Sequence, residues 1–215
     1  MSSKSHDQEG DFCPAQQARA YGELLPVYES RLSILQSVHA VVLDRVLEGM
    51  PVGASVLEVG CGAGSSLQLL ADRGFRAEGV DISSEMANAA HIRSGCPVHC
   101  ADFLKFDFPR QYDLVFAQAF VHLFPKALAL NVVCRLKSIA LKRVFFSTSL
   151  AEKSSEGLEK KDGILRYRSR YTSSEFLDLV AASVADKEWH AEYFDLPDTF
   201  GKKWRDVILH RNVSS

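Results

Sequence analysis

A short apolar run that leads into three closely spaced glycines constrains the fold more than any other part of this sequence. Residues Ser55–Val59 have the composition of a buried strand, and Gly60, Gly62 and Gly64 follow at once. A helical pattern over Ser65–Asp72 comes next. Glycine accepts positive φ angles and lets a ligand approach the backbone, and a helix start offers free N–H groups. The segment therefore predicts a strand, a glycine turn and a helix, where the turn either binds a ligand or is simply tight.

Short apolar runs alternate with helical segments from this point on. We expect further strands over 77–80, 97–101, 112–116 and 143–147, and helices over 84–92 and 125–136. The strand over 97–101 is expected to be buried. Strands separated by helices form right-handed βαβ units and a parallel sheet, so the sequence predicts an α/β fold.

The segment before the glycine turn predicts a helical cap. Residues 1–11 lack hydrophobic periodicity and are expected to form a flexible tail. Two cap helices are expected within 12–50, the first interrupted near Pro26 and the second ended by Gly49 and Pro51.

The C-terminal part of the chain predicts one more helix and two closing strands. Residues 151–172 are charged and contain glycine, and we expect them to form a lid or substrate segment. Thr172 and Glu175 make a capping-box pattern, which predicts a helix over 173–182. Two closing strands, expected as a hairpin at the sheet edge, are predicted over 189–195 and 207–210.

Composition excludes several classes of protein. The 215 residues include 25 Lys and Arg against 27 Asp and Glu, so a net charge of −2 argues against nucleic acid as the main partner. A single domain over 12–215 would bury roughly 70% of its unfolded-chain surface. The five cysteines include no Cys-x-x-Cys pair, which argues against a disulfide framework and a zinc ribbon. No segment approaches the roughly 18 apolar residues of a membrane span, so we expect a cytoplasmic protein without a membrane partner.

Glycine spacing discriminates between nucleotide cofactors. A dinucleotide fingerprint requires Gly-x-Gly-x-x-Gly. Counting from Gly60 places Ser65 at the third glycine, and counting from Gly62 places Leu67 there. A nicotinamide-dependent oxidoreductase therefore remains only a less favoured alternative. Acidic residues follow the next two predicted strands, at Asp81 and Asp102.

With these motifs in order, the chain from about Tyr21 onward resembles a class I S-adenosylmethionine-dependent methyltransferase of the small-molecule type. The resemblance implies a Rossmann-like three-layer sandwich, with a mostly parallel seven-stranded sheet, an antiparallel C-terminal hairpin strand and N-terminal capping helices. It also implies S-adenosylmethionine as cofactor, S-adenosylhomocysteine as product and no metal. The cofactor contacts carried over are Tyr21, Glu58, Gly60, Cys61, Gly62, Gly64, Asp81, Ile82, Asp102, Phe103, Ala117 and Gln118.

In this family the acid after strand two binds the ribose hydroxyls and the one after strand three meets the adenine amino group. One carboxylate can accept both ribose hydroxyls in charge-assisted hydrogen bonds, which suits Asp81. Ile82 and Phe103 would then sandwich the adenine ring. The alternative for Asp81 and Asp102 is helix capping or turn formation. No covalent chemistry is assigned to Cys61.

Several residues are candidates for the acceptor side. His122 is the best candidate for a general base, because imidazole titrates near neutral pH; the alternative is a pocket-lining role. Ala117 and Gln118 would lie beside the sulfonium. Tyr21 and Tyr28 resemble N-terminal tyrosines that close over the cofactor, where a ring attracts a cation by about 0.5–2 kcal/mol. Packing of their helix on the core is an equal alternative.

Three arginines alternate at 166, 168 and 170, on one face if the segment is extended. The three are candidates for binding an acidic group of the acceptor, with Arg168 and Arg170 assigned to the substrate site, and a solvated edge strand is the favoured alternative. Four possible metal ligands are close in sequence: His91, Cys96, His99 and Cys100. Strand alternation would separate the last two, so no metal site is expected.

The chain also departs from the family pattern. It lacks a Pro-Gly-Gly turn at 138–143, which leaves the bounds of strand five open, and residues 117–120 lack an Asn-Pro-Pro-Tyr signature. Transfer of a methyl group to an oxygen, nitrogen or carbon of a small molecule is therefore the favoured function. A non-catalytic interaction subunit is the main rival. We expect a monomer or homodimer that does not bind nucleic acid.

Overall fold

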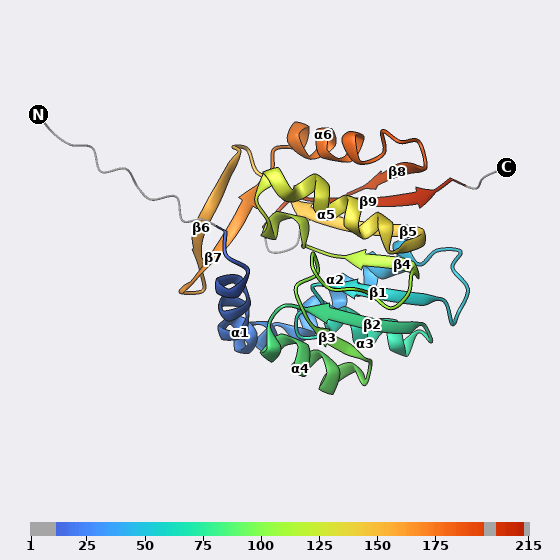
Figure 1. The fold of residues 1–215 in the computed structure, drawn as a ribbon. Helices are drawn as coiled ribbons and strands as arrows, with labels where there is room; N and C mark the ends of the chain where they lie inside the picture. Colours follow the sequence, from blue (N-terminus) through green and yellow to red (C-terminus); the bar gives the residue numbers. More distant parts are fainter. Residues whose placement is uncertain (1–11, 196–200, 213–215) are drawn as a thin grey trace, which may run out of the picture.

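The computed structural model describes residues 12–195 and 201–212, so the tail expected over 1–11 lies outside the described residues. A seven-stranded sheet has the order β3-β2-β1-β4-β5-β9-β8 (Figure 1). Its strands are β1 Ser55–Val59, β2 Arg76–Asp81, β3 Val98–Cys100, β4 Tyr112–Ala117, β5 Ala140–Ser149, β8 Trp189–Phe194 and β9 Trp204–Arg211. The helices are α1 Pro14–Ser30, α2 Leu32–Val46, α3 Ser65–Asp72, α4 Ser84–Ser94, α5 Lys126–Ser138 and α6 Ser173–Ser183.

Strand direction agrees with the predicted fold class. Strands β1 to β5 pair in parallel, and β9 pairs antiparallel with both β5 and β8. The expected closing hairpin is confirmed, with β8 at the edge of the sheet and β9 inserted next to β5. The mostly parallel sandwich with a C-terminal antiparallel strand is therefore present.

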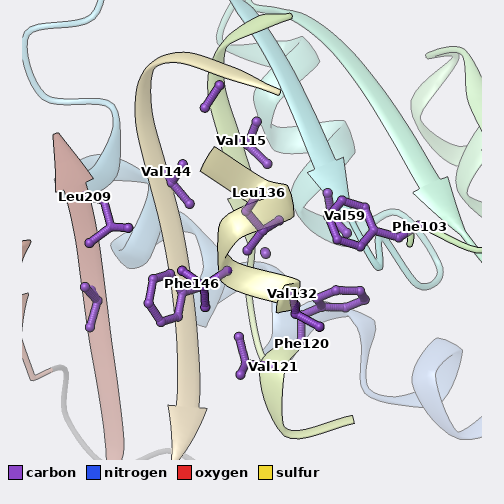
Figure 2. Packing of buried hydrophobic residues seen from close by; sticks show 14 of the residues in the cluster. Val59, Phe103, Val115, Phe120, Val121, Val132, Leu136, Val144, Phe146 and Leu209 are labelled. Carbon is purple, nitrogen blue, oxygen red and sulfur yellow. The ribbon is translucent and has the colours of Figure 1, made fainter. Parts of the chain in front are cut away.

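Alternation along the central strands explains the layers. On β5, Val144 and Phe146 join the cluster that contains α5 and α6, whereas Phe145 joins the cluster with α2, α3 and α4. Figure 2 shows the first cluster, where Val132 and Leu136 of α5 lie over the sheet. Successive side chains of a strand point to opposite faces, so each strand contributes to both helical layers.

Helix α1 departs from its prediction. It runs unbroken through Pro26, so the expected interruption is wrong. Proline lacks an amide donor and costs roughly 3 kcal/mol inside a helix. Packing on both sides of this position offsets that cost: Leu24 is fully buried, and the Tyr28 ring lies 6.3 Å from that of Tyr21.

Strands β3 and β5 also differ from expectation. Strand β3 is an edge strand with an exposed Cys100 and a half-buried His99, so the prediction of a buried strand is wrong. An edge strand has a neighbour on one side only, which leaves its side chains partly in water. Strand β5 runs from Ala140 to Ser149, longer at both ends than the predicted 143–147.

A separate antiparallel hairpin, β6 Ser155–Lys161 and β7 Ile164–Arg170, is inserted between β5 and α6. Asp162 and Gly163 form its turn with φ angles of 50° and 84°, typical of a two-residue hairpin turn. Figure 1 shows the hairpin beside α1 at one end of the sheet. It occupies the segment expected to be a lid.

Candidate active site

A cavity of about 640 Å³ lies where the parallel strands end. The loops after β1, β2, β3 and β4 form its floor, and α1, α2 and the β6–β7 hairpin supply further walls. Ligands of open α/β sheets bind outside the carboxyl ends of the strands. Among the predicted site residues the lining includes Tyr21, Tyr28, Glu58, Gly60, Cys61, Gly62, Asp81, Ile82, Asp102, Phe103, Gln118, His122 and Arg168.

The three glycines of the loop have different tasks. Gly60 and Gly62 line the cavity with φ angles of 68° and 52°. A Cβ on Gly60 would lie 2.6 Å from the Phe120 ring. Gly64 does not line the cavity; a Cβ there would lie 2.7 Å from Cα of Ala90 on α4, so this glycine serves helix packing.

Cys61 lines the cavity but is buried, with its Sγ 2.9 Å from where a Cβ on Gly79 would lie. Burial, with Asp81 and Glu58 nearby, holds the pKa of its thiol well above the usual range. A buried protonated thiol packs as a small apolar group rather than reacting.

Asp81 holds the glycine loop and the following turn together. Its Oδ2 accepts from the Gly62 amide at 2.9 Å and its Oδ1 from the Ser83 amide at 2.9 Å. Burial raises its pKa, and these two backbone donors oppose that shift. A carboxylate has about four acceptor positions, so Asp81 can still accept hydrogen bonds from a ligand. Capping and ligand binding are thus compatible roles here.

Asp102 behaves in the same way one strand further along. Its Oδ1 accepts from the Leu104 amide at 3.0 Å, and the side chain still lines the cavity. Ile82 and Phe103 line the cavity between the two acids, and the Phe103 ring lies edge-on to Phe120 at 5.6 Å. This end of the cavity therefore fits a flat apolar ligand group that carries hydrogen-bond donors for the two carboxylates.

Three lining side chains carry a buried acceptor oxygen without a partner among the described residues: Glu58, Gln118 and Asp206. Glu58 is buried, and its Oε1 accepts from the Ser66 hydroxyl. Its Oε2 and the Oε1 of Gln118 are buried without a hydrogen-bond partner among the described residues. Burial raises the pKa of Glu58 to about 8. Orphaned buried acceptors fit a ligand that brings donors. Ala117, in contrast, is fully buried in the core and does not line the cavity.

His122 occupies the opposite end of the cavity, in the short 3₁₀ turn Val121–Leu123 after β4. Its Nδ1 lies 3.2 Å from Oγ1 of Thr148, and its ring centroid lies 6.3 Å from that of Trp204. Burial holds the imidazole pKa well below its usual range, and the nearby cations, Arg168 first, lower it further. The imidazole is therefore neutral at pH 7.

The arginines of β7 do not form a solvated edge strand. Arg166 and Arg168 are only 2% and 6% exposed and line the cavity, so that alternative is wrong for them. Helix α1 covers the strand, where Gln17 pairs with the backbone of Tyr167. Arg170 is exposed, bonds Glu159 at 2.5 Å and does not line the cavity.

Sequence reasoning missed several lining residues, namely Lys161, Lys202, Trp204 and Asp206, and it did not assign Arg166 to the substrate site. Arg166 shares the alternation of Arg168, so its position on the same strand was a usable signal. The Asp162-Gly163 turn between two alternating runs was a hairpin signal that would have brought Lys161 to the site. The sequence carries no comparable signal for Lys202.

Comparisons with known proteins agree with this geometry. A family model described as a methyltransferase domain matches residues 56–139, the segment that holds both acids and Gln118. No curated protein sequence matches the chain significantly. The chain has the class I methyltransferase fold, and residues 56–139 match the model of a methyltransferase domain.

Three solved structures illustrate the similarity of this methyltransferase fold. The 1,6-didemethyltoxoflavin-N1-methyltransferase of Burkholderia thailandensis has a TM-score of 0.70 at 14% identity, over 98% of this chain and 99% of that one. The sugar N-methyltransferase KedS8 of Streptoalloteichus has a TM-score of 0.65 at 18% identity, over 99% of both chains. Magnesium protoporphyrin IX methyltransferase of Synechocystis, with bound S-adenosylmethionine, has a TM-score of 0.64 at 19% identity, over 82% of this chain and 79% of that one.

Within residues 12–195 and 201–212 no group of His, Cys, Asp and Glu side chains is placed to hold a metal ion. Across the same part of the chain, no helix has the length and apolar character needed to cross a membrane.

Proposed function

We propose that this methyltransferase domain transfers a methyl group from S-adenosylmethionine to a small molecule. The observation that carries the proposal is one continuous cavity with two chemically different ends. The glycine loop, Asp81 and Asp102 line one end, and His122 lines the other. The solved structures of similar fold include methyltransferases with bound S-adenosylmethionine or S-adenosylhomocysteine and small acceptors.

The residues present fit the cofactor. Asp81 would accept hydrogen bonds from the ribose hydroxyls, and Asp102 would accept one from the adenine amino group. Ile82 and Phe103 would flank the adenine ring. The unpaired oxygens of Glu58 and Gln118 would accept from the ammonium group of the methionine part. Tyr21, Cys61, Gly60 and Gly62 complete the wall around it. This assignment leaves the end near His122 and Tyr28 for the acceptor.

When bound, S-adenosylmethionine supplies an electrophilic methyl group: the acceptor lone pair forms a bond to its carbon while the carbon–sulfur bond breaks and sulfur keeps that pair. The proton of a hydroxyl or amine acceptor passes to His122, whose neutral imidazole has Nε2 without a hydrogen bond to a described residue. The enclosed walls hold the acceptor near attack distance, an effect worth up to about 7–11 kcal/mol in ideal cases.

Residues 12–215 are proposed to act as one domain, with 12–50 as the cap and 151–172 as the acceptor lid. The five cysteines are free thiols, which suits a reducing compartment such as the cytoplasm. We further propose a monomer or homodimer that acts without nucleic acid.

Calorimetric titration with S-adenosylmethionine, S-adenosylhomocysteine and NAD⁺ tests the cofactor. Both sulfur compounds should bind and NAD⁺ should not. Asp81→Asn should weaken binding by about tenfold or more, because charge-assisted bonds are worth roughly 1.5–3 kcal/mol each. Asp107→Asn is the matched control, since Asp107 is exposed and outside the cavity. Binding of NAD⁺ alone would favour the oxidoreductase alternative.

Turnover requires a second experiment, because cofactor binding does not exclude a non-catalytic subunit. Methyl-labelled S-adenosylmethionine is incubated with the protein and a panel of small hydroxy and amino compounds. We expect a labelled product whose formation slows about 100-fold or more in His122→Ala, within the usual range for a general base. Cofactor consumption with no labelled product across the panel would count against a small acceptor.

A further inference from the structure

Four cationic side chains line the end of the cavity that holds His122. They are Lys161 from β6, Arg166 and Arg168 from β7, and Lys202 just before β9. All four lie close enough to His122 to lower the pKa of its imidazole, in addition to the effect of burial. Such a cluster is unexpected in a protein whose net charge is −2.

The negative charge around this cluster is too small to balance it. Glu159 pairs with three arginines at once: Arg166 at 3.2 Å, Arg168 at 3.7 Å and Arg170 at 2.5 Å. The Lys202 side chain makes no hydrogen bond or ion pair with a described residue. Asp206 also lines the cavity, but burial and Asp195 raise its pKa to about 7, so it offsets less than one charge.

The hydrogen bonds of the two buried guanidinium groups are incomplete. Arg166 donates to the Tyr21 hydroxyl at 2.8 Å, and Arg168 donates to the Ser149 hydroxyl at 2.5 Å. The Nε of each is buried without a partner among the described residues. A buried charge is costly unless it is paired and hydrogen-bonded. The charged form of Lys161 is also disfavoured, because burial and the nearby Arg166 lower the pKa of its ammonium group to about 8.

The cluster lies away from the two proposed adenosine contacts, Asp81 and Asp102, and meets the proposed cofactor wall only where Arg166 donates to the Tyr21 hydroxyl. Asp81 ends β2, whereas Ser149, the partner of Arg168, ends β5. The order β2-β1-β4-β5 separates these strands by three spacings, roughly 14 Å at about 4.8 Å each. The cations are therefore at the acceptor end, beside the candidate base.

We propose that this cationic cluster binds an oxyanion of the methyl acceptor, so that the acceptor is a small carboxylic or phosphoric acid with its nucleophile near His122. This rests on the proposed function. The planar fork of each arginine matches the paired oxygens of a carboxylate or phosphate. The two lysines add point charges without a fixed orientation.

Calorimetry with small probes tests the cluster before the acceptor is known. The protein, both unloaded and saturated with S-adenosylhomocysteine, is titrated with benzoate, inorganic phosphate and the neutral benzamide. We expect one of the oxyanions to bind at one site at least about tenfold more tightly than benzamide. Which one binds distinguishes a carboxylic from a phosphoric acceptor.

Variants inside and outside the cavity are compared for their affinity for the oxyanion. Arg168→Gln should weaken oxyanion binding about tenfold or more, and Lys161→Gln about threefold. Lys161→Gln removes a half-buried side chain without an ion pair, so it keeps the test valid should Arg168→Gln fail to fold. Arg170→Gln is the control: it shares Glu159 but lies outside the cavity, and it should change nothing.

Failure of the proposal is distinguishable from failure of the proposed function. Absence of oxyanion binding, or equal losses in Arg168→Gln and Arg170→Gln, would overturn the cationic site. A parallel loss of S-adenosylhomocysteine affinity in Arg168→Gln would overturn it too, by assigning the arginine to the carboxylate of the cofactor. If S-adenosylhomocysteine does not bind the wild type, the methyltransferase proposal fails, while the unloaded titration still decides the oxyanion site.

Discussion

Glu58 connects the cavity to the stability of the chain. Its folded pKa of about 8 is raised above the ordinary value of 4.5 by burial. Between these values the folded state holds a proton that the unfolded state releases, so stability is highest below pH 4.5 with respect to this group and falls as pH rises toward 8. At neutral pH the burial of Glu58 therefore lowers the stability of the fold, at a position where a ligand is expected to bind.

Thermal unfolding of the unliganded protein from pH 5 to 8 tests this effect. We expect Tm of the wild type to fall by roughly 7–14 °C more than that of Glu58→Gln, which stays neutral throughout, because the shift is worth up to about 3.5 kcal/mol over this pH range. For a chain of this size about 1 kcal/mol moves Tm by roughly 2–4 °C. Glu48→Gln is the control, since Glu48 is exposed. Parallel curves for the wild type and Glu58→Gln would show that Glu58 is already ionised in the fold.

At this scale, local pattern predicts some site residues and not others. Asp81 and Asp102 could be assigned because each directly follows a strand, and strand order brings such positions to one edge. Gly64 and Ala117 share the same motifs but face α4 and the core. The direction in which a residue of a turn or strand end points depends on tertiary packing, which short motifs do not encode.

Among the elements, the β6–β7 hairpin controls the acceptor end, and helix α1 holds it in place. The Gln17 amide forms two bonds with the backbone of Tyr167, each 3.0 Å long, and a third with the Leu123 carbonyl at 3.3 Å. Gln17→Ala should lower the unfolding free energy by roughly 1–3 kcal/mol, because it leaves buried backbone groups unsatisfied. Urea denaturation measures this loss.

Hydrogen exchange shows where the Gln17→Ala effect is felt. Exchange should quicken in 155–170, while β1 and β4 keep their protection, because the sheet core does not depend on this contact. Gln16→Ala is the matched control on the same helix, since the Gln16 side chain makes no hydrogen bond with a described residue. Uniformly faster exchange over all strands would instead mean that α1 and the hairpin unfold together with the sheet.

The elements differ in how well sequence predicts them, for physical reasons. Strand β1 and helix α3 have the predicted bounds, because β1 is buried on both faces and α3 starts directly after the glycine turn. The sequence predicts the hairpin only as a charged lid or substrate segment, since Arg166 and Arg168 look like surface residues until α1 covers them. Polar residues buried in a cavity wall do not produce the hydrophobic pattern on which such predictions depend.

At the scale of the whole molecule, the two helical layers share one sheet, and the cavity draws its walls from segments as distant as α1 and β9. A ligand held there should therefore stabilise the entire chain as one unit. S-adenosylhomocysteine at 100 times its Kd contributes about 2.7 kcal/mol, which corresponds to a rise in Tm of roughly 5–10 °C. Calorimetric melting should show a single transition that moves upward as a whole. If only part of the transition moved, residues 12–215 would contain two independently folding units, and the acceptor lid would not belong to the cofactor domain.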